Sequence, residues 1–304
     1  MKTSGSILVK LILSISIIAL SILATLLISE AIFPDSIATL QRLLKIQAPA
    51  NPLLAELLLR MKLSQGVQTI GVFLVPALAM VGVLYGRKGI SLMLASKVHW
   101  RDLFDAVFLV LFSTTIMVLA SRYSQLLPWP QKYMEANAQS EKLTNLLLFG
   151  TSYFDLTLNL IIVCVIPAFC EEFFFRGFLQ RIFMKWIKDP HLCIFLAAVL
   201  FSAFHFDAVM FLPRFLLGAM LGYLFYWTGS LWVPMLAHFI NNAQYVVSAF
   251  ILNRMDKSPA TAAGSGGDFE ISNFNVIFSL VLIVLLLFSI YMRHMNVREF
   301  PKLP

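Results

Sequence analysis

The chain has 304 residues, of which 59% are apolar and only 13% are charged. Soluble domains carry about 25% charged residues, so this composition excludes an ordinary water-soluble protein. Lysine and arginine outnumber aspartate and glutamate by 23 to 16, but the basic residues form no stripe interleaved with aromatic residues, which argues against a nucleic-acid partner. The charges instead separate apolar runs, a pattern typical of the loops of a membrane protein.

Apolar runs predict about eight membrane spans, because a spanning helix needs roughly 20 apolar residues. The last long run is divided by the turn residues Thr228-Gly229-Ser230. Since open sheets cannot span lipid, the predicted fold is all-α, a polytopic transmembrane helical bundle. The runs are Leu11–Ser29, Ser64–Gly86, Ala106–Ser121, Leu156–Cys170, Pro190–Phe206, two within Phe215–Asn253, and Ile271–Met292.

The first run is longer than the ~7–15 residues of a signal-peptide core and is followed by no small-x-small cleavage site, so we expect a retained span. With the N-terminus inside, the cytoplasmic segments hold more lysine and arginine than the opposite ones. This bias predicts a multi-pass protein of the cell membrane with both termini cytoplasmic. Cys164, Cys170 and Cys193 lie in or beside spans without CxxC spacing, and they indicate no disulfide framework.

Three parts follow along the chain. Residues 1–155 are expected to form N-terminal transmembrane and interfacial helices, with the amphipathic piece Ser36–Lys62 at the membrane surface. Residues 156–253 are expected to form a catalytic helix core that carries the polar chemistry. Residues 254–304 begin with the Gly/Ser-rich stretch Asp256–Glu270, which predicts an exposed loop before a C-terminal span.

Ionisable groups at membrane depth are costly, so each is a functional hypothesis. Glu172 and Arg176 are four residues apart in the favourable order for a helical ion pair, which fits a structural role for Glu172 as well as a chemical one. That pairing leaves Glu171 without a local partner. Burial disfavours the ionised form of a carboxylate, and a more basic carboxylate suits a general base, so Glu171 is the candidate base.

Two histidines lie on separate predicted spans. The patterns Phe201-x-x-x-His205 and His238-x-x-x-Asn242 each place two residues on one helix face. A lone core histidine is more often only hydrogen-bonded, but two of them near an acidic pair favour a site.

Helix geometry brings these segments to one depth. A hairpin that turns near Asp189-Pro190 sets His205 level with Phe173. Glu171 lies about 15 Å below Arg181 at 1.5 Å per residue, and His238 descends a similar distance from the same side. The sequence therefore predicts a polar site below the cytoplasmic surface.

Three motifs also resemble those of a known family. EEFFFRGFLQ (Glu171–Gln180), FSAFH (Phe201–His205) and TGSLWVPMLAHFINN (Thr228–Asn242) are similar to the motifs of the CPBP intramembrane proteases. This family includes the CAAX prenyl endoproteases of the Ras-converting type and bacterial abortive-infection-like relatives. The resemblance runs from about Ile162 to Tyr245.

The resemblance implies an intramembrane endopeptidase in which Glu171 activates water with help from His205. His238 and Asn242 would stabilise the oxyanion, as imidazoles and amides can. It implies no cofactor and no metal. The expected partners are membrane lipid and a peptide or lipidated-protein substrate, of which a prenylated CAAX C-terminus is one. The implied supporting residues are Glu172, Arg176, Phe201 and, as an alternative to Asn242, Asn241.

Two other readings stay open from the residues. Glutamate and histidine are also zinc ligands, but no H-E-x-x-H motif is present, so a zinc-dependent membrane protease is the nearer alternative, which chelators would reveal. A non-catalytic role, as a membrane scaffold, bacteriocin-immunity protein or transporter, is the other. A Glu171→Gln variant with full biological activity would favour that second reading.

Overall fold

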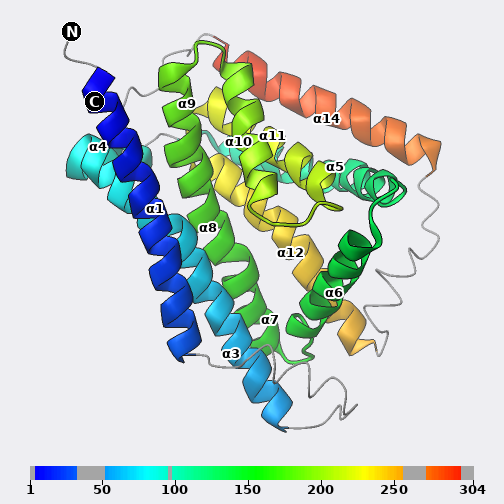
Figure 1. Cartoon of the computed structure of the whole chain (residues 1–304). Helices are drawn as coiled ribbons and strands as arrows, with labels where there is room; N and C mark the ends of the chain where they lie inside the picture. Colours follow the sequence, from blue (N-terminus) through cyan, green and yellow to red (C-terminus); the bar gives the residue numbers. More distant parts are fainter. Residues whose placement is uncertain (1–3, 33–51, 95–97, 256–271, 296–304) are drawn as a thin grey trace.

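The computed structural model describes residues 4–32, 52–94, 98–255 and 272–295. Helices and short connections make up these residues, and no strand occurs among them. The predicted all-α membrane bundle is therefore confirmed (Figure 1). The predicted loop Asp256–Glu270 lies outside the described residues, as does most of the predicted interfacial piece before Pro52.

The elements are helices joined in series, several of them without a break. Three π-helical segments, η1 (Ile70–Leu74), η2 (Leu160–Val165) and η3 (Phe173–Gln180), continue the α-helices on either side. The α-helices are α1 (Ser4–Ile32), α3 (Pro52–Thr69), α4 (Val75–Leu94), α5 (Trp100–Gln125), α6 (Gln131–Leu147), α7 (Tyr153–Asn159), α8 (Ile166–Glu172), α9 (Arg181–Trp186), α10 (Pro190–Ala203), α11 (Phe211–Thr228), α12 (Trp232–Arg254) and α14 (Asn273–His294).

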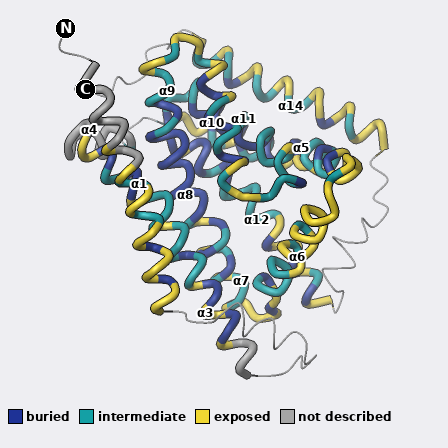
Figure 2. Tube along the Cα trace, viewed as in Figure 1, coloured by how far each residue is buried: buried dark blue, intermediate teal, exposed yellow. Residues whose placement is uncertain are grey.

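One of these series, which we call the central rod, runs through α7, η2, α8, η3 and α9. It covers Tyr153–Trp186, 34 residues in all, and forms the long green helix of Figure 1. Its middle is the most deeply buried part of the chain in Figure 2, where dark blue follows α8 upward. The central rod therefore carries its polar residues into the interior of the bundle.

Five helical stretches in the described residues are long and apolar enough to cross a membrane. All the apolar runs predicted as spans coincide with helices, but Pro190–Ala203 has only 14 residues. At 1.5 Å per residue this helix is about 21 Å long, less than the ~30 Å hydrocarbon core. The chain is thus a multi-pass membrane protein, and α10, which forms a hairpin with α11, is too short to cross the hydrocarbon core by itself. The five stretches are Glu56–Val83, Trp100–Gln125, Tyr153–Trp186, Trp232–Arg254 and Asn273–His294.

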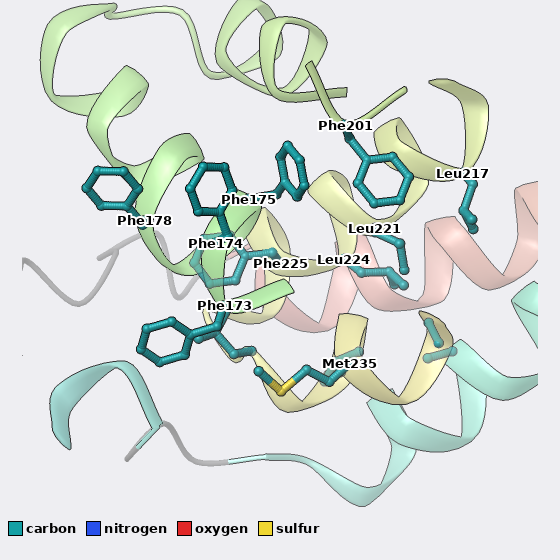
Figure 3. Packing of buried hydrophobic residues seen from close by; sticks show 14 of the residues in the cluster. Phe173, Phe174, Phe175, Phe178, Phe201, Leu217, Leu221, Leu224, Phe225 and Met235 are labelled. Atoms are coloured by element: carbon teal, nitrogen blue, oxygen red, sulfur yellow. The ribbon is translucent and has the colours of Figure 1, made fainter. Parts of the chain in front are cut away.

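A buried aromatic cluster joins the central rod to the α10–α11 hairpin (Figure 3). Phe173, Phe174 and Phe175 come from η3, and they are at most 3% exposed. The Phe175 ring meets the Phe201 ring edge-to-face at 5.2 Å between centroids, an arrangement that aromatic pairs prefer. The cluster surrounds the polar residues described below with apolar side chains.

A cluster of charged residues, which the sequence analysis did not predict, fastens α14 to α5. Arg293 pairs with Asp102 and, at 2.7 Å, with Asp105, while His294 Nε2 lies 2.9 Å from a carboxylate oxygen of Asp102. Both aspartates are buried, and their partners lie about 190 residues later in the chain. Because α14 is otherwise mostly exposed, this cluster holds one end of it in place (Figure 2).

Candidate active site

Two consecutive glutamates end α8, where the central rod passes into π-helical η3. Glu171 is 8% exposed and Glu172 is fully buried. Consecutive residues of a helix point about 100° apart, so the two carboxylates face different neighbours. π-Helical turns occur frequently at functional sites because they change the direction in which side chains point.

Glu172 is the centre of a hydrogen-bonded set. Its Oε1 accepts from Arg176 Nη1 at 2.7 Å and lies 2.9 Å from His238 Nδ1. The ion pair expected from the spacing of Glu172 and Arg176 is therefore present. The bond to His238 links the central rod to α12, whereas the resemblance implied only that Glu172 supports Glu171.

The contact with Glu172 favours the tautomer of His238 that has a proton on Nδ1. An ionised carboxylate can only accept a hydrogen bond, so His238 Nδ1 carries the proton and donates a hydrogen bond to Glu172. The other ring nitrogen, Nε2, then faces Glu171 Oε2 at a distance of 4.0 Å. This distance is too long for a direct hydrogen bond, and Glu171 Oε2 makes none with the described residues.

Arg176 also ties the central rod to α11. Its Nη2 donates to the Gly218 carbonyl at 2.7 Å, and one turn later Gln180 Nε2 donates to the Gly222 carbonyl at 3.1 Å. The guanidinium carbon lies 4.8 Å from the centre of the Phe201 ring, within cation–π range. Arg176 thus contacts the acid, the hairpin and the aromatic cluster at once.

Glycine at 218 allows the close approach of α10 and α11. A Cβ there would lie 3.1 Å from Phe201 Cδ1 and 3.2 Å from the backbone Cα of Ala198. Gly218→Ala is therefore expected to displace the Phe201 ring and to lower stability by about 1–3 kcal/mol, the usual cost of overpacking. The thermal midpoint in detergent measures this effect.

Gly82→Ala is the matched control for that substitution, because no heavy atom lies within 4 Å of a Cβ built at Gly82. Alanine in an exposed helical position is expected to be neutral or mildly stabilising. Equal midpoints for the Gly218 and Gly82 variants would contradict the proposed packing constraint.

His205 lies just beyond the end of α10. Its Nδ1 is 2.8 Å from the Phe201 carbonyl, which can only accept, so Nδ1 carries the proton and Nε2 points elsewhere. The rings of His205 and His238 both contact the Phe201 ring, at 5.1 Å and 5.8 Å between centroids. Phe201 therefore lies against both imidazoles, and His205 is exposed where His238 is buried.

The two asparagines lie one turn after His238 on α12. Asn242 Nδ2 donates to the Val163 carbonyl in η2 at 3.1 Å, and Asn241 Nδ2 donates to Asn242 Oδ1 at 3.2 Å. A carboxamide has two N–H donors, so one donor of Asn242 remains for another acceptor. His238 and Asn242 together fasten α12 along the central rod.

The structure therefore brings together Glu171, Glu172, Arg176 and His238, with Phe201 beside them. His205 is linked to this group by its contact with the Phe201 ring, and Asn242 by its hydrogen bond to the Val163 carbonyl of the central rod. In the described part of the chain, no group of three or more His, Cys, Asp or Glu side chains is arranged to hold a metal ion.

Comparison with known proteins matches the same part of the chain. Residues 153–244 fit the family model described as type II CAAX prenyl endopeptidase Rce1-like. The uncharacterized protein YpbD of Bacillus subtilis (strain 168) is 34% identical over 91 residues, which are 29% of this chain and 43% of that protein. The match thus spans less than half the length of this relative, and no solved structure matches the chain. The resemblance carried by the three motifs is confirmed over residues 153–244.

Proposed function

We propose that this chain is an intramembrane endopeptidase of the glutamate type, in which Glu171 activates the water that hydrolyses a peptide bond. The observation that carries the proposal is the pair formed by Glu171 Oε2 and His238 Nε2, 4.0 Å apart in a buried setting. A water held between these two groups would hydrogen-bond both of them at once. The Rce1-like match over the same residues supports a CAAX-type protease.

The first step uses Glu171 as the base. Glu171 takes a proton from the water, and the oxygen attacks the carbonyl carbon of the scissile bond, which leaves a tetrahedral intermediate with a negative oxygen. The same carboxyl then gives its proton to the leaving nitrogen as the C–N bond breaks. The products are a carboxylic acid and an amine, and no other reactant is needed.

Glu172 and Arg176 act through His238 in this scheme. Glu172 holds Nδ1 of His238, much as the aspartate of a serine-protease triad fixes its histidine. We place His238 Nε2 at the developing oxyanion, to which it donates when the ring carries a second proton. Arg176 balances the charge of Glu172, and the free donor of Asn242 is the second group suited to the oxyanion.

The substrate class follows from the setting. We propose a peptide or lipidated protein that reaches the site from the membrane, and a prenylated CAAX C-terminus is the first class to test because it appears in the description of the matched family. We further propose a location in the cell membrane with both termini cytoplasmic, from the bias of lysine and arginine in the loops.

Chelation tests the proposal against its zinc-dependent alternative. The protein in detergent is assayed on internally quenched peptides, prenylated CAAX peptides among them, with and without EDTA and 1,10-phenanthroline. We expect the same initial rate with and without chelator, because the base is Glu171 and not a metal-bound water. A rate lost on chelation and restored by added zinc would support the zinc-dependent reading instead.

A further inference from the structure

The turn between α10 and α11 covers residues 204–210 and is partly exposed. The helix α10 that precedes it has 14 residues and is about 21 Å long, less than the ~30 Å hydrocarbon core. Non-helical backbone at membrane depth is tolerated only where protein buries it or where it lines a water-filled space. Here the turn contains the exposed His205 and ends at Met210.

Polar contacts hold this turn in one conformation. Ser202 Oγ donates to the Phe211 carbonyl at 2.7 Å, and Ser124 on α5 donates to the Val209 carbonyl. Asp207 accepts from the backbone N–H of Met210 at 3.2 Å and pairs with Arg214 at 3.1 Å. The turn is therefore fixed at both ends and along its length.

Phe206 stands out within the turn for two reasons. Its φ of 52° makes it the single non-glycine residue with positive φ in the described residues. Its side chain is 93% exposed, more than any other large apolar side chain in the described part of the chain. The left-handed conformation is disfavoured for residues with a Cβ, and glycine is the usual residue after a helix end.

These two facts together need an explanation outside the chain. A glycine would form the same turn without strain, and an exposed ring adds no packing within the fold. Backbone strain of this kind gathers at functional sites. Phe206 directly follows His205, whose ring contacts the Phe201 ring that also touches His238.

The neighbours of Phe206 favour substrate over lipid as the group that it contacts. His205, Asp207 and Arg214 are polar groups, and such groups at membrane depth face protein or water and not acyl chains. A lipid-facing side chain needs only to be apolar and requires no strained backbone, as the exposed residues along α14 illustrate.

We infer that Phe206 contacts the substrate, and that its ring packs against a large apolar side chain next to the scissile bond. Phe206 is then a specificity-determining residue. The inference rests on the proposed protease function, so the experiments below separate the failure of one from the failure of the other.

Kinetics on paired peptides test the contact. Two quenched peptides differ only at one position beside the scissile bond, which is leucine or glycine. Phe206→Ala is expected to lower kcat/KM on the leucine peptide by about ten- to hundred-fold, mainly through KM, which corresponds to the loss of one buried aromatic contact. The glycine peptide is expected to be cleaved at an unchanged rate, and Phe206→Leu to restore most of the loss.

Two controls separate this contact from a role in the fold. Phe274→Ala on α14 removes another highly exposed phenylalanine, 72% exposed, and is expected to leave kcat/KM on both peptides unchanged. Phe206→Gly is expected to raise the thermal midpoint, because it relieves the positive φ, while it loses the leucine preference. Equal kinetics of wild type and Phe206→Ala on both peptides would overturn the inference and leave the protease function intact.

Photo-crosslinking gives an answer that does not depend on turnover. A benzophenone amino acid is placed at position 206, or at 274 as control, in the Glu171→Gln variant in lipid bicelles with the biotinylated leucine peptide. Peptide captured at 206 and not at 274, and displaced by unlabelled peptide, supports the contact. Crosslinks to lipid at both positions, with no peptide captured, would overturn it in favour of a lipid-facing side chain.

Discussion

Glu171→Gln is expected to lower peptide cleavage by about 10²- to 10⁴-fold, the range that a positioned general base contributes. Glutamine keeps the size of the side chain but cannot take a proton from water. The fold should survive the change, because Glu171 Oε2 makes no hydrogen bond with the described residues and lies 4.0 Å from His238. Initial rates on the quenched peptide panel measure the loss, and the thermal midpoint checks the fold.

Glu135→Gln provides the matched control for this experiment. Glu135 is an exposed carboxylate on α6, and we expect its amide variant to retain the wild-type rate. A Glu171→Gln variant that cleaves as fast as wild type would rule out Glu171 as the base. If wild type cleaves no peptide while Glu171→Gln still complements a deletion of the gene, the non-catalytic scaffold reading would be favoured over the protease.

Features set by local spacing were predictable from the sequence. Helical periodicity places Glu172 and Arg176 within reach of each other, and the structure shows their contact at 2.7 Å. The turn between α9 and α10 was also predictable. Asp189 caps α10 by accepting a hydrogen bond from the His191 N–H at 2.9 Å, and Pro190 follows it. Each apolar run that predicted a span coincides with a helix in the described residues.

The relative level of α10 and the central rod was predictable by counting residues from the turn near Asp189-Pro190. The expected level of His205 was that of Phe173, and the structure brings Phe204 against Phe174 and Phe175, at 6.0 Å and 5.8 Å between centroids. A rise of 1.5 Å per residue is nearly the same in all helices, so counting from a turn gives depth. It does not give rotation about the helix axis, which π-helical segments change.

Contacts between distant segments were not predictable, because tertiary packing decides them. No local pattern connects Glu172 with His238, which are 66 residues apart, or Asn242 with the Val163 carbonyl. The pairing of Arg293 with Asp102 was not predicted for the same reason, because charged residues near the ends of predicted helices are typical of loops. The positive φ of Phe206 goes against the preference of its residue type, so no propensity could indicate it.

Arg176→Met is expected to lower the free energy of unfolding by about 3–5 kcal/mol, the cost of removing one partner of a buried ion pair. Arg176 is 1% exposed, and its loss leaves the Glu172 carboxylate buried without its cation. The Gly218 carbonyl loses its donor at the same time, and an unsatisfied buried acceptor carries a further cost. The thermal midpoint in detergent and resistance to proteolysis in bicelles measure the effect.

The double variant Glu172→Gln, Arg176→Met separates stability from chemistry. It removes both charges, so much of the lost stability should return, as it does when a buried ion pair is replaced as a whole. The glutamine side chain still offers an oxygen to His238 Nδ1 but no negative charge, so the hydrogen bond that orients the imidazole is weaker and cleavage should stay low. A double variant that is stable and fully active would show that Glu172 and Arg176 serve only the fold, and the proposed role of Glu172 in holding His238 would be wrong. A double variant as unstable as Arg176→Met alone would instead assign the loss to the Gly218 carbonyl and the contact with Phe201, not to the buried charge of Glu172.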